Sequence, residues 1–153
     1  MSLFKAAGAA TTKAQGGSLT KKAFWCTGDM VAAKGFAANL GIKVYTKKAD
    51  KWMNNYDDEE VILIDEIITH KHKKLAYNLS KWADHGEMQA DTVSGPVTLK
   101  HNYLVVLSEK LCDDIWKDNY TRDKLKIRFK EKHFGDLPGN DWKKKKLNGV
   151  VFK

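Results

Sequence analysis

Two short runs of consecutive apolar residues constrain the fold of this chain more than any other feature. One run is Val61-Ile-Leu-Ile64 and the other is Tyr103-Leu-Val-Val-Leu107. A strand without polar residues at alternate positions is typical of a parallel sheet, because helices cover both of its faces. The sequence therefore predicts an α/β fold with a largely parallel sheet.

Apolar spacing and turn residues predict further elements around these two strands. They are a strand over 23–26 that runs into a loop, a helix over 30–40, a strand over 42–45, an amphipathic helix over 73–84 and a hairpin over 90–99. Strands that alternate with helices agree with the α/β prediction.

The chain has 153 residues and is 42% hydrophobic, enough for the core of one domain. Residues 1–22 are rich in Ala, Gly, Ser, Thr and Lys and predict a flexible basic leader, and residues 135–153 predict a loose Lys-rich tail. The folded domain is expected over residues 23–134.

The longest apolar stretch has five residues, whereas a membrane span needs roughly 20. Two cysteines and no secretory signal indicate an intracellular protein.

The net charge of +8 is concentrated at the two ends of the chain. Residues 1–28 contain four lysines and residues 142–153 contain five, and neither segment contains an acid. The segment between them has 18 basic and 19 acidic residues. The overall charge alone is therefore no argument for nucleic-acid binding.

Two carboxylates, Asp65 and Glu66, directly follow the first apolar run. The carboxyl edge of an open α/β sheet is where such folds bind ligands. In phosphate-handling enzymes the first carboxylate of such a pair holds Mg²⁺ and the second polarises the attacking water. The alternative is a strand that simply ends at the surface in solvated acids.

A degraded phosphate-binding motif follows the strand predicted over 23–26. Compared with GxxxxGK[ST], Gly28 and Lys34 have the correct spacing, but Ala33 replaces the second glycine and Gly35 replaces the hydroxyl residue that binds the metal. The alternative is a simple strand-to-helix turn.

Several blocks of sequence resemble, in order and at similar spacing, the superfamily 3 helicase domain of replication-associated (Rep) proteins. These proteins belong to small circular single-stranded DNA viruses and related plasmids, and the resemblance covers residues 23–134. The blocks are Lys51-Trp52, Tyr56, Glu59-Glu60-Val-Ile-Leu-Ile-Asp-Glu66, Lys81-Trp-Ala-Asp84, Ala90-Asp91, Gly95, Leu104-Val-Val-Leu-Ser108, Asp114-Ile115, Leu125-Lys-Ile-Arg-Phe129 and His133-Phe134.

The resemblance implies a P-loop NTPase-like (AAA+-type) domain of three layers that uses ATP and Mg²⁺ to unwind DNA during rolling-circle replication. It further implies DNA as a partner, single-stranded or as a replication intermediate, and self-association into a ring such as a hexamer. For a viral protein, it implies the host nucleus as the location.

Residue roles follow from the resemblance at six positions. Gly28 and Lys34 would bind phosphate, Asp65 would hold the metal and Glu66 would be the catalytic base. Arg128 would reach the γ-phosphate of a neighbouring subunit, and Glu109 stands where a polar sensor asparagine is expected.

Departures from the family pattern lead us to expect weak nucleotide binding and poor turnover. A carboxylate at Glu109 would repel the γ-phosphate. The other departures are Ala33, Gly35, Val93, Ser94 and Ile127. Two interpretations stay open: an ATPase and helicase module with an atypical site, or a catalytically inactive relative that binds nucleic acid or itself.

Basic residues alternate with other residues late in the chain, at Lys124, Lys126, Arg128, Lys130 and Lys132. On a strand this alternation would line one face with positive charge. Lys124 and Lys126, together with Lys100 after the expected hairpin, are candidate nucleic-acid contacts, although such a stripe can also be a solvated face.

Histidines and tryptophans carry weaker signals. The histidines and the two cysteines have no metal-ligand spacing. The tryptophans are expected in the core rather than as stacking platforms; they are Trp25, Trp52, Trp82, Trp116 and Trp142.

Overall fold

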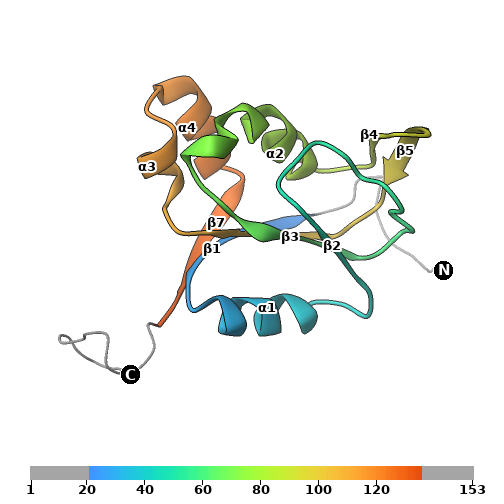
Figure 1. The fold of residues 1–153 in the computed structure, drawn as a ribbon, viewed down its shortest axis with the longest axis horizontal. Helices are drawn as coiled ribbons and strands as arrows, with labels where there is room; N and C mark the ends of the chain where they lie inside the picture. The colour runs from blue at the N-terminus through green and yellow to red at the C-terminus, as the bar shows by residue number, and fades with distance from the viewer. Residues whose placement is uncertain (1–20, 136–153) are drawn as a thin grey trace.

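The computed structural model of this chain describes residues 21–135, which form a five-stranded sheet between two layers of helices (Figure 1). The strand order is β2-β3-β6-β1-β7, and every neighbouring pair is parallel. The strands are β1 (Lys22–Gly28), β2 (Val44–Lys47), β3 (Val61–Ile68), β6 (Tyr103–Ser108) and β7 (Phe129–Phe134). The predicted α/β fold with a largely parallel sheet is confirmed.

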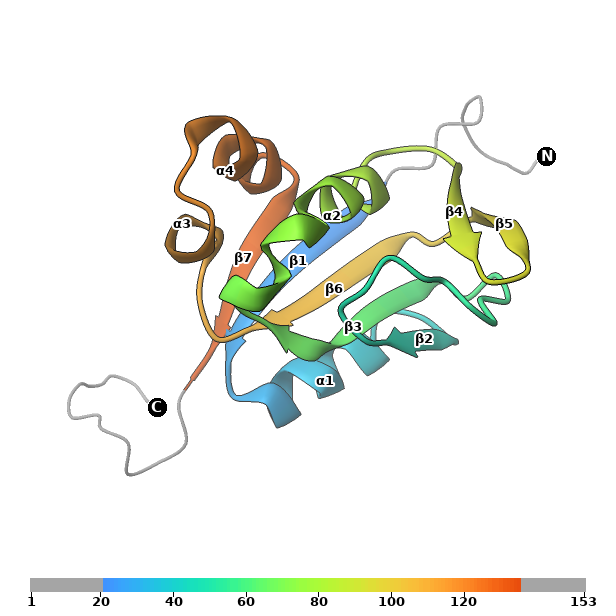
Figure 2. The ribbon, with the colours of Figure 1, turned by 45° about the horizontal axis from the view of Figure 1, so that its top comes forward.

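The helices are divided unequally between the two faces of the sheet (Figure 2). Helix α1 (Met30–Ala38) covers one face. The other face carries the 3-10 helix η2 (His70–Leu75), α2 (Ala76–Trp82), α3 (Cys112–Ile115) and α4 (Asn119–Lys126). A separate antiparallel hairpin, β4 (Met88–Thr92) and β5 (Gly95–Leu99), follows α2.

The domain has two hydrophobic cores, one on each face of the sheet, and the apolar run of β3 contributes side chains to both. Ile62 and Ile64 pack into the larger core under α2 and α3, together with Trp25. Val61 and Leu63 pack into the smaller core under α1. Because successive side chains point to opposite faces and both faces are covered, every residue of this run is buried.

Several predicted elements are confirmed, some with shifted ends. β1 contains the strand predicted over 23–26, and the hairpin predicted over 90–99 is β4 and β5. The helix predicted over 30–40 is α1, which ends two residues earlier than expected. The strand expected over 42–45 begins at Val44, because the Glu60 carboxylate accepts a hydrogen bond from Ile42 N at 2.6 Å and holds that residue in the preceding loop.

The helix predicted over 73–84 begins earlier than the apolar spacing indicated. Thr69 and His72 form a capping box that starts η2 at His70, and α2 follows from Ala76 to Trp82. The capping signal lies outside the apolar residues on which the prediction was based.

The prediction that five basic residues line one face of a strand is wrong. Lys124 and Lys126 lie on α4, whereas Lys130 and Lys132 lie on β7. The Asp118 side chain caps the first turn of α4 by accepting a hydrogen bond from Thr121 N at 2.9 Å, which favours a helix here. The strand prediction was based on the alternating lysines and did not consider this capping residue.

Of the five tryptophans, Trp25, Trp82 and Trp116 are buried as predicted. Trp52 is 37% exposed, and Lys51 Nζ lies 4.6 Å from the centre of its ring. Trp142 lies outside the described residues, as do the predicted tail beyond Gly135 and residues 1–20 of the predicted leader. Within residues 21–135, no helix is long and apolar enough to cross a membrane.

Candidate functional site

The connections that leave β1 and β6 pass to opposite faces of the sheet. After β1 the chain enters α1 on one face, and after β6 it enters α3 on the other (Figure 2). The crevice between two such neighbouring strands, at their carboxyl ends, is the usual ligand site of open α/β sheets. The topology alone therefore defines a candidate site at this edge.

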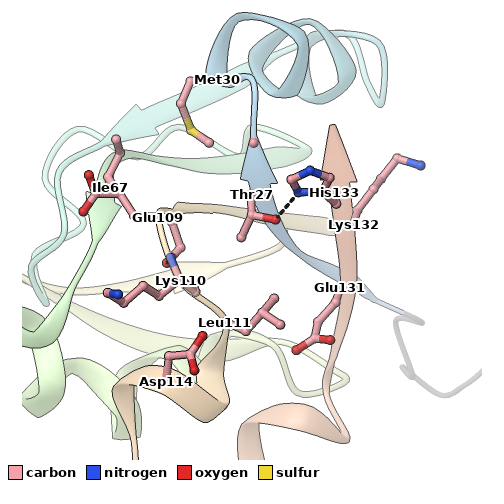
Figure 3. A pocket seen from close by; sticks show the side chains of 12 residues that line it. Thr27, Met30, Ile67, Glu109, Lys110, Leu111, Asp114, Glu131, Lys132 and His133 are labelled. Atoms are coloured by element: carbon pink, nitrogen blue, oxygen red, sulfur yellow. Dashed lines mark hydrogen bonds between the residues drawn. The ribbon is translucent and has the colours of Figure 1, made fainter. Parts of the chain in front are cut away.

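A pocket of about 700 Å³ occupies this crevice (Figure 3). Its walls come from the ends of β1, β6 and β7 and from the segment that leads into α3. Thr27 Oγ1 and His133 Nδ1 are hydrogen-bonded at 2.9 Å across β1 and β7. The remaining lining residues are Gly28, Met30, Ile67, Ser108, Glu109, Lys110, Leu111, Asp114, Glu131 and Lys132.

The pocket is lined by charges of both signs. Glu109, Asp114 and Glu131 are acidic, and Lys110 and Lys132 are basic. Glu109, the residue at the expected sensor position, thus lies at the candidate site. A carboxylate there makes the pocket less favourable for a phosphate than a neutral amide would.

Lys34 and Asp65 are brought into contact although they are far apart in the sequence. Lys34 Nζ on α1 lies 3.1 Å from Asp65 Oδ1 on β3. Asp65 follows Leu63 at the strand period of two and so faces α1. The predicted phosphate-binding cation and the predicted metal ligand therefore stand together, outside the walls of the pocket.

Glu66 faces the opposite side of the sheet from Asp65. Strand β3 continues to Ile68 instead of ending before the carboxylates, and its pairing with β6 is interrupted between Ile64 and Ile68. Glu66 Oε2 lies 3.1 Å from His72 Nε2 on the η2 side. The two carboxylates expected side by side beyond the strand end lie within the strand, with different partners.

The hydrogen bonds of His72 determine which group donates and which accepts in its contact with Glu66. The Nδ1 atom of His72 accepts a hydrogen bond from Thr69 N at 3.1 Å, so the ring proton is on Nε2. The Nε2–H group consequently donates to Glu66. Glu66 is an acceptor whose position is fixed by the capping box of η2.

No open phosphate-binding loop separates β1 from α1. Only Asp29 lies between Gly28 and Met30, and Lys34 lies inside the helix. Asp29 Oδ1 accepts from the amides of Val31 at 3.0 Å and Ala32 at 3.4 Å. These are the donors that a phosphate at a helix N-terminus would use. The local geometry is that of a strand-to-helix turn.

Gly28 is needed by the sheet itself. Its φ is +96°, and a Cβ atom at this position would lie 1.9 Å from the carbonyl oxygen of Phe134. Asp29 N donates to the same oxygen at 3.3 Å. The glycine therefore permits the close approach of β1 and β7 at the pocket wall, with or without a bound phosphate.

Arg128 lies at the opposite edge of the sheet from the pocket. It directly precedes β7, whose first residue pairs with Ala23 at the start of β1. Its Nη1 donates to the carbonyl oxygen of Lys124 at 2.8 Å, and its Nη2 lies 3.5 Å from Asp84 Oδ2. Arg128 is held at the amino edge, away from the pocket of its own chain.

The three lysines predicted to contact nucleic acid lie in different surroundings. Lys126 Nζ pairs with Asp113 at 2.9 Å, and this partner raises the pKa of Lys126. Lys100 is exposed after β5, and its backbone amide donates to Tyr56 Oη at 3.1 Å. Lys124 lies beside two exposed tyrosine rings, Tyr77 and Tyr120.

Sequence reasoning missed these two tyrosines. Leu75, Leu79 and Trp82 mark the buried side of this helical segment, and Tyr77 lies on its exposed side. An aromatic residue on the polar side of a predicted helix could have indicated a binding surface. Tyr120 lies on a helix whose single buried residue is Leu125. Their proximity depends on the packing of α2 against α4, which links residues 43 positions apart.

The described part of the chain gives little indication of a metal site built from side chains alone or of a reactive cysteine. Within residues 21–135, no three His, Cys, Asp or Glu side chains are grouped to hold a metal. Burial raises the pKa of Cys26 to about 11 and that of Cys112 to about 12, so both stay as thiols. Mg²⁺ is often bound by one or two carboxylates together with substrate phosphates, and the partly exposed Asp65 fits that role.

In comparisons with known proteins, no protein-family model matches this chain and no curated protein is significantly similar to it.

Proposed function

We propose that this chain is a P-loop NTPase-like (AAA+-type) module of the Rep superfamily 3 helicase kind, which acts on DNA and binds Mg²⁺ and ATP weakly. The observation that carries the proposal is the contact between Lys34 and Asp65 at 3.1 Å. In the resemblance these are the phosphate-binding cation and the metal-site carboxylate, and such a pair must converge to serve one nucleotide.

The order of the strands supports the same proposal. Strand β6, which ends at Ser108 directly before the expected sensor position Glu109, lies between β1 and β3. Insertion of the sensor strand between the cradle strand and the acidic strand is the arrangement expected of an AAA+-type sheet. The candidate pocket at the β1–β6 crevice then corresponds to the nucleotide side of the sheet.

The proposal gives each residue the role that the resemblance implies. Lys34 would contact phosphate oxygens, and Asp65 would hold the metal. When bound, Mg²⁺ would neutralise charge on the phosphates. Glu66 accepts from His72 on the far face, so it must be redirected before it can accept a proton from a water beside Lys34. The expected consequence is slow turnover.

Arg128 adds a requirement for self-association. At the amino edge it lies away from the pocket of its own chain, so its proposed role as a finger needs a second copy. A ring such as a hexamer would bring the amino edge of one subunit towards the pocket of the next.

A second candidate function, a catalytically inactive nucleic-acid-binding or self-assembling relative, is favoured by Asp29. Its carboxylate occupies the helix N-terminal donors and places a negative charge where phosphate would bind. A domain that no longer binds ATP can keep this turn at no functional cost.

A turnover assay with Mg²⁺ and ATP, combined with calorimetric binding of a non-hydrolysable analogue, separates the two candidates. The first candidate predicts measurable binding that Lys34→Ala and Asp65→Ala both abolish, with turnover that Glu66→Gln reduces. If the folded protein neither binds the analogue nor hydrolyses ATP, the inactive relative is the correct interpretation.

A further inference from the structure

A groove with an aromatic wall lies between α2 and α4, away from the pocket at the carboxyl edge. Its volume is about 400 Å³, and its lining includes Tyr77 on α2 and Tyr120 on α4. Figure 2 shows the two helices side by side on one face of the sheet. The other lining residues are Ala76, Ser80, Thr121, Lys124 and Leu125.

Both tyrosine side chains are largely exposed. Tyr77 is 66% exposed and Tyr120 is 75% exposed. Lys124 Nζ lies 5.9 Å from the ring centre of Tyr77 and 5.3 Å from that of Tyr120. One ammonium group therefore lies against two accessible rings, a combination that offers both stacking and a positive charge.

The surroundings of the groove add positive charge. Lys81 lies one helical turn after Tyr77, and Lys73 and Lys74 lie about one turn before it. The nearby acid Asp84 already pairs with Arg128. On α4, Asp123 pairs with Arg122.

We propose that this groove binds single-stranded nucleic acid, with bases stacked on Tyr77 and Tyr120 and phosphates beside Lys124 and the lysines of η2 and α2. Exposed aromatic rings within a positively charged groove are the features with which proteins hold unpaired strands. A duplex keeps its base faces stacked inside the helix, so the groove discriminates against it. This inference rests on the nucleic-acid part of the proposed function and is independent of ATP.

The test measures binding of a fluorescent oligodeoxythymidylate by anisotropy, without nucleotide. The double variant Tyr77→Ala/Tyr120→Ala is expected to bind at least about tenfold more weakly, because each base–aromatic contact is lost. The matched variant Tyr77→Phe/Tyr120→Phe keeps the rings and is expected to bind like the parent. Both positions are exposed, and circular dichroism checks that every variant is folded.

Two further arms separate stacking from charge. Lys124→Gln is expected to lower the salt dependence of log Kd by about 0.7, the contribution of one phosphate contact on a single strand. Lys43→Gln, directly before the edge strand β2, is the charge-matched control and should leave binding unchanged. An abasic oligonucleotide of equal length is expected to bind the parent and the double Ala variant equally.

Three results would overturn the inference. One is equal binding of the strand by the parent and the double Ala variant, which leaves DNA binding intact but places it elsewhere. Another is equal affinity of the parent for the abasic and the normal strand. The third is no binding of single-stranded DNA or RNA at all, which removes the nucleic-acid partner of the proposed function as well. A strict preference for oligouridylate would keep the groove and count against DNA as its ligand.

Discussion

Lys34 and Asp65 neutralise each other across the gap between α1 and β3, with Nζ 3.1 Å from Oδ1. A phosphate that approaches Lys34 therefore competes with a carboxylate of the same chain. A divalent cation relieves this competition, because it takes up the Asp65 charge. In the proposed function, the ion pair would thus link phosphate affinity to Mg²⁺.

The variant Asp65→Asn tests this linkage. Without metal, we expect it to bind inorganic pyrophosphate about tenfold more tightly than the parent, because a charge-assisted contact to Lys34 becomes available. It should bind the Mg²⁺ complex of an ATP analogue more weakly. Calorimetry with and without Mg²⁺ measures both, with Lys43→Ala as a control. Phosphate binding that is equally strong in Lys34→Ala would disprove the role of this lysine.

Asp29 offers a way to separate helix capping from phosphate repulsion. Asp29→Ser keeps a good cap, so the free energy of unfolding should change by less than about 0.5 kcal/mol, whereas Asp29→Ala should lower it by about 1 kcal/mol. Because the serine variant lacks the negative charge, we also expect tighter binding of the ATP analogue. Urea unfolding and calorimetry measure the two effects. An unchanged affinity in the serine variant would show that phosphate does not approach this helix end.

Gly28 and Gly35 form a matched pair of glycines with opposite expected responses. Gly28→Ala puts a Cβ atom against the Phe134 carbonyl at a positive φ and should lower the free energy of unfolding by at least about 2 kcal/mol. Gly35 lies inside α1 with nothing within 4 Å of its added Cβ, so Gly35→Ala should raise the free energy of unfolding by about 0.5–1 kcal/mol. Urea denaturation of both variants checks the pair. Similar effects of the two substitutions would contradict the observed approach of β7.

Because His101 is buried, we expect the protein to lose stability in acid. Burial lowers its pKa to about 3, with the charge of Lys21 acting in the same direction, and its Nε2–H donates to the Trp82 carbonyl at 2.8 Å. The unfolded chain takes up this proton near pH 6.5, whereas the folded chain does so only near pH 3. The free energy of unfolding should therefore fall as the pH drops from about 6.5 towards 3.

The variant His101→Gln keeps a donor for Trp82 and does not titrate. Its free energy of unfolding should fall less steeply over the same pH range. The difference between the slopes of the parent and the variant should be up to about 1.4 kcal/mol per pH unit. Urea unfolding at a series of pH values gives both slopes. Parallel slopes for the parent and the variant would show that His101 is not the group that titrates.

A role for Arg128 in a neighbouring site predicts complementation between two inactive variants. Arg128→Ala and Lys34→Ala should each lose ATP turnover, but in a randomly mixed ring up to about one quarter of the interfaces combine an intact site with an intact finger. Mass photometry checks that rings form when nucleotide or DNA is present. A strictly monomeric protein, or a mixture as inactive as its components, would leave Arg128 with only its contacts to Asp84 and Lys124 within its own chain.

The parallel sheet could be predicted from sequence because β3 and β6 each contain a run of apolar residues whose side chains are covered on both faces. Asp65 and Glu66 were harder to place, since a run of apolar residues does not show how far the strand continues beyond it. The strand ends at Ile68, and alternation sends the two carboxylates to opposite faces. The motif around Gly28 matched a phosphate-binding pattern in spacing, but Asp29 shortens the turn to a single residue.

Helix α4 and the groove were not predictable for a different reason. Alternating lysines imitated a strand, and the helix buries Leu125 as its single core anchor, so its apolar period is weak. Tyr77 and Tyr120 meet through tertiary packing. Their shared cation, Lys124, was selected from charge, but its neighbourhood required the fold.

The position of β1 between β6 and β7 sets an order for the folding of this domain. Its two neighbours begin at Tyr103 and Phe129, so during synthesis the first strand has no hydrogen-bonding partner until most of the described chain has left the ribosome. Pairing over such a sequence separation is slow and exposes unpaired strand edges in the meantime. A chain that stops after Lys126 would lack β7 and leave β1 as an open edge, with the Trp25 ring deprived of its contact with Phe129. The last strand is thus the closing step of assembly, and premature termination should yield aggregates rather than a smaller folded domain.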